Sequence, residues 1–155
     1  VYVCSSFHNT AMLAAELHQT DHAVFEIFTA EILNRVLPKV QACDIAKVAD
    51  GLRHLNRPLD KILDVVARET VRKLDDFRPY ELLITGISFV LLKRTTMKPW
   101  LMPCLLQRLS DLNAELRQED KERLSFVETS WSIYEPAMLE LLPQQSRDVF
   151  KLANC

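Results

Sequence analysis

Residues 44–55 read DIAKVADGLRHL. An acidic residue opens this stretch, and apolar residues follow at the spacings of three and four that place them on one face of an α-helix. Small residues lie among them. One such stretch predicts an ordinary amphipathic helix, whereas a stretch that is copied along the chain predicts a repeat protein.

The stretch is copied on both sides. Residues 81–92 read ELLITGISFVLL and lie 37 positions later, and residues 9–20 read NTAMLAAELHQT and lie 35 positions earlier. The opening position of the three copies holds Asn9, Asp44 and Glu81, and a small residue recurs at Ala14, Ala49 and Gly86. Asn and Asp favour helix N-caps, and Glu stabilises the first turn through the helix dipole. The small residue would let another helix approach closely.

The segments between the copies also repeat. Before Asp44, one helix face carries Phe28, Leu33, Leu37 and Val40, and before Glu81 another carries Leu63, Val66, Thr70, Leu74 and Phe77. The breaks between repeats contain Asp21, Pro58 and Pro99. A two-helix unit with a period of about 37 residues is typical of an α-solenoid. We therefore predict an all-α protein, a solenoid of about four helix-turn-helix repeats.

The repeat boundaries follow from this register. ELLITGISFVLL alone could be a buried strand, but its register with residues 44–55 predicts the most buried second helix. Residues 100–116 and 123–134 predict the first and second helices of a weaker third copy. Residues 136–155 resemble the start of a further repeat that Pro143 interrupts. The predicted single array comprises residues 1–20 (partial), 21–57, 58–98, 99–135 and 136–155 (partial), within what we expect to be a longer chain.

Composition excludes several function classes. Two glycines are too few for a phosphate-cradling loop, and no apolar run has the roughly 18–20 residues that span a bilayer. The four cysteines form no C-x-x-C pair. His18 and His22 stand four residues apart without the H-E-x-x-H glutamate, so we expect no metal site. No catalytic motif is present, so we predict a protein that is not an enzyme and needs no cofactor.

The residues resemble a known family. Second helices that open with an acidic residue, as in DIAKVADGLRHL, and first helices such as residues 63–82, with Phe77 before the Pro79 turn, are similar to organellar octotricopeptide and heptatricopeptide repeats and to FAST-kinase-like leucine-rich segments. The resemblance covers roughly residues 9–116. A RAP domain, often found with such repeats, is not recognisable. The resemblance implies a mitochondrial or other organellar matrix protein that binds or stabilises RNA, or that forms a structural part of a mitochondrial ribosome.

The charge distribution bears on RNA. The net charge is −2, which does not favour a phosphate-binding protein. However, residues 35–98 contain thirteen basic and eight acidic side chains, a net charge of +5, whereas residues 1–34 contain no Lys or Arg. The basic residues are concentrated in the middle of the chain.

Arginines recur there at the repeat spacing, because Arg72 follows Arg35 by 37 residues and Arg108 follows Arg72 by 36. In a solenoid such positions form a row that could follow an RNA backbone. The candidate RNA-binding residues are Arg35, Lys39, Lys61, Arg68, Arg72 and Arg108. The alternative is an ordinary solvated helix face, paired with Glu31, Asp64, Glu69 and Asp75.

Other side chains favour structural roles. Asp75, Asp76 and the QEDKE run (118–122) indicate solubilising charge on turns, and Trp100 and Trp131 are expected to fill helix interfaces rather than stack on bases. Two function classes remain. One is an RNA-associated organellar repeat protein within a larger assembly, and the other is a HEAT- or armadillo-like scaffold that binds protein partners without touching RNA.

Overall fold

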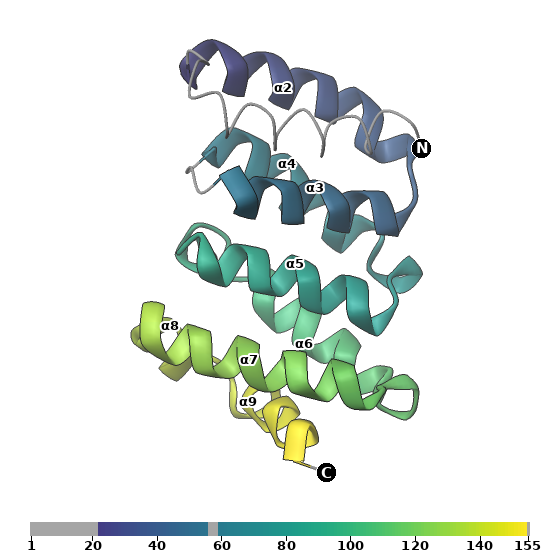
Figure 1. The fold of residues 1–155 in the computed structure, drawn as a ribbon, viewed down its shortest axis with the longest axis vertical. Coiled ribbons are helices and arrows are strands. Elements are labelled where there is room, and N and C mark those ends of the chain that lie inside the picture. Colours follow the sequence, from purple (N-terminus) through teal and green to yellow (C-terminus); the bar gives the residue numbers. More distant parts are fainter. Residues whose placement is uncertain (1–21, 56–58, 155) are drawn as a thin grey trace. The chain divides into compact units, whose positions relative to one another are not determined.

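The computed structural model describes residues 22–55 and 59–154, and every regular element within these ranges is helical (Figure 1). No strand occurs among them. The all-α prediction is confirmed. The chain divides into two compact units between Asp76 and Phe77, which we call the N-terminal and C-terminal units. The division falls inside the predicted repeat 58–98.

The N-terminal unit contains α2 (His22–Val36), the 3-10 turn η1 (Leu37–Lys39), α3 (Ala42–Leu55), α4 (Asp60–Arg72) and the 3-10 turn η2 (Leu74–Asp76). Helix α4 packs against both α2 and α3. Leu33, Leu37, Leu52 and Val66, which lie on the predicted apolar faces, are all buried. Burying each such side chain stabilises a fold by roughly 1.5–3 kcal/mol, so this apolar interface holds the unit together.

The C-terminal unit contains α5 (Pro79–Leu91), η3 (Thr95–Met97), α6 (Leu101–Asp111), η4 (Asn113–Glu115), α7 (Gln118–Tyr134), α8 (Pro136–Glu140), α9 (Gln144–Asp148) and η5 (Val149–Asn154). Helix α5 packs against α6 and α7, and α7 also packs against η5. Residues 81–91 are helical and mostly buried, so the prediction of a buried helix rather than a strand is confirmed. At Gly86, an added Cβ would lie 3.5 Å from Met102 Cε, which is an ordinary van der Waals contact with α6.

A buried polar link joins α7 to the segment that follows α5. Trp131 Nε1 donates to Thr95 Oγ1 at 3.2 Å, and Thr95 Oγ1 donates to Glu135 Oε2 at 2.6 Å. Trp131 is 1% exposed. Since the starts of α5 and α7 also line one hollow, described below, the two helices run side by side in the same direction (Figure 1).

One local order of elements occurs three times: an α-helix, a 3-10 turn and a second α-helix. The second helices α3, α5 and α7 begin at Ala42, Pro79 and Gln118, so they recur after 37 and 39 residues. Each carries an acidic residue at its third position, and these residues are Asp44, Glu81 and Asp120. The predicted first and second helices of the third copy are therefore present.

Two sequence predictions are wrong. The QEDKE run does not lie on a turn, because it forms the start of α7, and although Glu119 and Glu122 are exposed, Asp120 is buried. Trp100 does not fill an interface: it precedes α6 and is 41% exposed, because the helix turns Leu101 and Met102 inward instead. Trp131 is buried as predicted.

Some predictions fall outside the described residues. These are the partial repeat 1–20, His18, Asp21, Pro58, and the side chains of His22 and Phe28. The predicted interruption at Pro143 is present, because two five-residue helices, α8 and α9, flank it. None of the helices in the described ranges is both long and apolar enough to cross a bilayer.

Candidate nucleic-acid and anion-binding sites

Two of the predicted RNA-binding residues, Arg68 and Arg72, reach from α4 to the segment of the chain that contains two others, Arg35 and Lys39. Arg68 Nη2 donates to Asn34 Oδ1 at 3.1 Å, and Asn34 directly precedes Arg35. Arg72 Nη2 donates to the carbonyl oxygen of Pro38 at 3.2 Å, and Pro38 directly precedes Lys39. These contacts bring α4 against the end of α2 and η1. We call Arg35, Lys39, Arg68 and Arg72 the basic surface.

The three arginines of the basic surface are paired with carboxylates of their own helices. Arg35 Nη2 lies 2.8 Å from Glu31, Arg68 Nε lies 3.1 Å from Asp64, and Arg72 Nη2 lies 2.6 Å from Glu69. Their side chains are nevertheless 76%, 52% and 53% exposed. The predicted helix-face pairing is thus confirmed for Glu31, Asp64 and Glu69. Such exposed pairs each contribute only about 0.2–1 kcal/mol to stability.

The remaining two candidates are placed differently. Lys61 lies in a groove of about 450 Å³ between α2 and α4, which Arg68 also lines together with Glu31, Asp60 and Asp64. Acidic side chains therefore outnumber basic ones in that groove. Arg108 belongs to α6 of the C-terminal unit and is half-buried. The structure thus places Lys61 in one groove with Arg68, and only Arg108 lies in the other unit.

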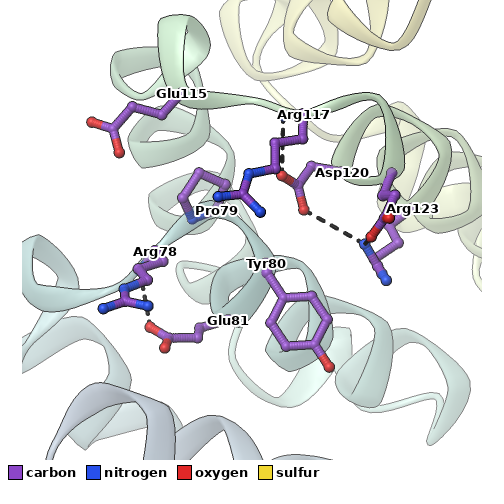
Figure 2. A pocket seen from close by; sticks show the side chains of 9 residues that line it. Arg78, Pro79, Tyr80, Glu81, Glu115, Arg117, Asp120 and Arg123 are labelled. Carbon is purple, nitrogen blue, oxygen red and sulfur yellow. Dashed lines mark hydrogen bonds and ion pairs between the residues drawn. The ribbon is translucent and has the colours of Figure 1, made fainter.

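The C-terminal unit contains a second collection of three arginines, where α5 and α7 begin (Figure 2). They surround a hollow of about 590 Å³, which we call the arginine hollow. Its lining residues are Arg78, Pro79, Tyr80, Glu81, Glu115, Arg117, Glu119, Asp120 and Arg123. Arg78 and Arg117 are the N-cap residues of the two helices, so equivalent positions of two repeats face the same space.

Two carboxylates of the arginine hollow are bonded to the backbone of these N-caps. Glu81 Oε2 accepts from the backbone N–H of Arg78 at 2.9 Å, and Asp120 Oδ2 accepts from that of Arg117 at 3.1 Å (Figure 2). Each bond satisfies one of the N–H groups that a helix start leaves without an intrahelical partner. Both acids therefore have a local structural role.

The three guanidinium groups of the hollow differ in their surroundings. Arg123 Nη1 lies 3.6 Å from both Glu119 and Asp120, and its guanidinium lies 4.8 Å from the centre of the Tyr80 ring. By contrast, the side chains of Arg78 and Arg117 are exposed and have no ion pair or hydrogen bond with the residues that the structure describes. These two charges are available to a ligand.

Sequence reasoning missed Arg78, Arg117 and Arg123. It aligned the arginines on the first helices, at 36- and 37-residue spacings. Arg78 and Arg117 instead precede Glu81 and Asp120 by three residues each, in a 39-residue register. Aligning the third copy on its acidic residue, rather than on its leucines, would have shown that both N-caps are arginine.

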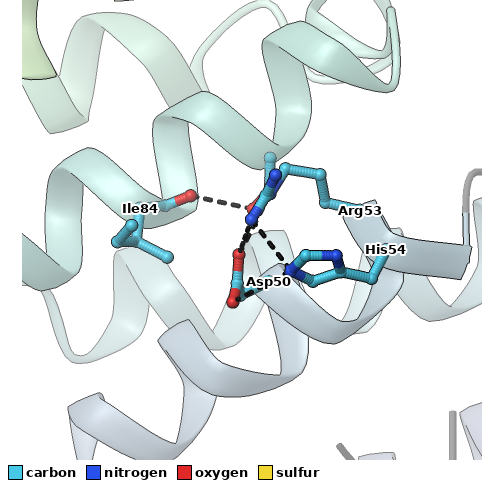
Figure 3. A network of polar contacts seen from close by, with 5 residues as sticks. Asp50, Arg53, His54 and Ile84 are labelled. Atoms are coloured by element: carbon cyan, nitrogen blue, oxygen red, sulfur yellow. Dashed lines mark hydrogen bonds and ion pairs between the residues drawn. The ribbon is translucent and has the colours of Figure 1, made fainter. Parts of the chain in front are cut away.

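A polar cluster on α3 gives no sign of catalysis. Arg53 Nη2 donates to Asp50 Oδ1 at 2.6 Å and lies 3.0 Å from His54 Nε2 (Figure 3). These residues lie within one helical turn and form an ordinary surface network. Among the residues in ranges 22–55 and 59–154, no group of His, Cys, Asp and Glu is arranged to hold a metal ion.

Large apolar side chains are also exposed in the C-terminal unit. On α7, Phe126 is 50% and Ile133 67% exposed, and Leu141 after α8 is 75% exposed. Phe126 and Ile133 lie seven residues apart and therefore share one face of the helix. Apolar surface of this kind is typical of contacts between proteins.

In comparisons with known proteins, the chain matches no family model, no curated protein and no solved structure.

Proposed function

We propose that this protein is a non-catalytic α-solenoid that associates with organellar RNA through the basic surface of its N-terminal unit. It would act in the mitochondrial matrix, either by binding and stabilising RNA or as a structural component of a mitochondrial ribosome. The observation that carries the proposal is the gathering of Arg35, Lys39, Arg68 and Arg72 on the adjoining ends of α2 and α4.

The solenoid part of the proposal rests on recurrence. The order of helix, 3-10 turn and helix returns three times, and the acidic third position of the second helix returns with it. In a solenoid, each such unit buries the face that its neighbour leaves open.

The RNA part rests on the weakness of the existing ion pairs. Each arginine of the basic surface is exposed, and its intrahelical pair contributes less than about 1 kcal/mol. A guanidinium forms two parallel hydrogen bonds with phosphate oxygens, and phosphate binding also releases counterions from the RNA. Exchange of a carboxylate for a phosphate is therefore favourable at low salt.

The direct test measures the affinity for single-stranded RNA at several salt concentrations. For a single strand, the slope of log K against log [salt] is about −0.7 per phosphate contact. We expect R35A/R68A/R72A to reduce the slope by about 2 and to lower the affinity at low salt at least about tenfold. The matched control is K93A/R147A/K151A, which removes three cations of the C-terminal unit. Equal slopes in the two variants would contradict the proposal.

A variant that leaves the helix contacts intact guards against unfolding. Arg68 and Arg72 contact α2 and η1, whereas Arg35 bonds within its own helix and Lys39 is exposed. R35A/K39A therefore removes two charges without touching the packing of α4, and we expect it to reduce the salt slope by about 1.4. An unchanged slope would argue against direct RNA contact.

The second candidate function is a protein–protein scaffold of HEAT or armadillo type. It is favoured by the exposed Phe126, Ile133 and Leu141 of the C-terminal unit. If it is correct, F126S/I133S abolishes assembly with the partner complex, while R35A/K39A leaves assembly unchanged. The RNA-binding proposal instead predicts that R35A/K39A lowers the affinity for RNA, while F126S/I133S leaves that affinity unchanged.

A further inference from the structure

We propose that the arginine hollow of the C-terminal unit binds a phosphate group, held between the guanidinium groups of Arg78 and Arg117. This inference concerns a different unit and different side chains from the basic surface, and it does not rest on RNA binding there.

The first argument is the state of the two side chains. Arg78 and Arg117 line the same hollow of about 590 Å³, and neither side chain is bonded to any residue in the described ranges. Two like charges that line one space disfavour each other, and an anion placed between them relieves that repulsion. Arginine is suited to oxyanions because its N–H donors form a planar fork.

The second argument concerns the four carboxylates that also line the hollow. Glu81 and Asp120 are bonded to backbone N–H groups, and Asp120 together with Glu119 faces Arg123. None of these bonds involves the side chain of Arg78 or Arg117. The four carboxylates nevertheless outnumber the three arginines of the hollow, so an anion is favoured only where it contacts the two guanidinium groups directly.

The third argument selects phosphate over a carboxylate ligand. A carboxylate can satisfy the fork of one arginine, whereas a phosphate has enough oxygens to accept from two guanidinium groups at once. A phosphate can therefore bridge Arg78 and Arg117, which a carboxylate bonded to one fork does not do.

The test is a titration of the ¹⁵N-labelled protein followed by amide chemical shifts, with ionic strength held constant by sodium chloride. The probes are inorganic phosphate and acetate. We expect saturable shifts at Arg78, Tyr80, Arg117 and Gln118, with at least about tenfold weaker binding of acetate. Acetate binding as tight as phosphate binding, or no saturable shift in the millimolar range, would overturn the proposal.

Variants assign the effect to the two arginines. R78A/R117A should lose at least tenfold in phosphate affinity, whereas R147A/K151A, an equal change of charge in the same unit, should retain it. E115Q/E119Q should bind phosphate more tightly, because it lowers the negative charge at the rim and releases Arg123. The proposal fails if R78A/R117A binds phosphate as the unmodified protein does, or if E115Q/E119Q binds it more weakly.

The source of the phosphate is resolved with two further probes. Adenosine 5′-monophosphate, compared with adenosine, reports on a free nucleotide, and single-stranded oligouridylate reports on an RNA backbone. Tight binding of either probe that is lost in R78A/R117A supports the site and identifies its source. Equal binding of adenosine and its monophosphate would overturn it.

Discussion

The basic surface of the N-terminal unit and the arginine hollow of the C-terminal unit contain the same residue type in opposite states. Arg35, Arg68 and Arg72 each lie within 3.1 Å of a carboxylate on their own helix. Arg78 and Arg117 have no such partner among the residues described. The difference follows from position, because a residue in the later turns of a helix has neighbours at i−4 and i−3, whereas an N-cap arginine lies before the first turn.

The comparison shows what arginine spacing indicates and what it does not. Spacing selected Arg68 and Arg72 of α4, which lie against α2 and η1. It does not reveal whether a charge is already compensated. For ligand binding, the pairing state of an arginine matters as much as its place in the repeat.

The largest expected effect concerns the packing that holds α5 and α7 together at their C-terminal ends, the opposite ends from the arginine hollow. Trp131 is fully buried and donates to Thr95, so W131A leaves a cavity and a hydroxyl without its donor. We expect a loss of about 3–5 kcal/mol in the free energy of unfolding, measured by urea denaturation. W131F, which keeps most of the ring volume, should lose clearly less. A loss below about 1 kcal/mol would show that this link does not hold the two helix ends together.

The next effect concerns the start of α7. Asp120 is buried and accepts the backbone N–H of Arg117, so D120A should destabilise the protein by about 0.5–2 kcal/mol. The same substitution also removes a carboxylate that faces Arg123 and should strengthen phosphate binding. D120N keeps an acceptor oxygen and serves as the control, with a smaller loss of stability. A weaker affinity for phosphate in both variants would contradict the charge argument.

Paired and unpaired arginines should differ in their contribution to stability. R68A and R72A each remove an ion pair and a contact with α2 or η1, and we expect a loss of up to about 1 kcal/mol in each case. R78A and R117A remove exposed side chains that make no such contact and should change stability by less than about 0.5 kcal/mol. Thermal denaturation of the four variants checks this order. Equal losses of stability in all four would contradict the difference between paired and unpaired arginines.

The smallest effect tests the close approach at Gly86. An added methyl group would meet Met102 at 3.5 Å, which is ordinary van der Waals contact, and alanine favours a helix by up to about 1 kcal/mol over glycine. G86A should therefore be neutral or slightly stabilising. G86L has no space for its side chain between α5 and α6 and should be destabilising. A clear loss of stability in G86A would show that α6 lies closer to α5 than described.

Much of the fold could be predicted from local pattern. The copies of DIAKVADGLRHL located α3 and α5, because apolar spacing and an acidic first turn are properties of a single helix. The third copy was harder to align, because the run QEDKE contains several acids and only packing selects Asp120 as the buried one. The exposure of Trp100 likewise depends on how α6 is rotated, which periodicity defines only to within a residue or two.

The candidate sites were less predictable. A row of arginines can be found by counting residues, but the hollow depends on two helix starts being placed side by side, and on which acids turn back to cap them. Those acids, Glu81 and Asp120, lie only three residues from Arg78 and Arg117, yet they are bonded to the backbone N–H groups of these arginines and not to their guanidinium groups. Local sequence does not show whether a carboxylate caps the helix backbone or forms an ion pair with a neighbouring arginine.

The most direct test of the contrast between the two regions is an NMR measurement of the arginine Nε–Hε groups, before and after addition of inorganic phosphate. We predict that Arg35, Arg68 and Arg72 have ordered Nε–Hε groups at the outset, and that Arg78 and Arg117 are mobile and become ordered only with phosphate. The account is contradicted if Arg78 and Arg117 are already as ordered as Arg68, or if phosphate orders neither of them.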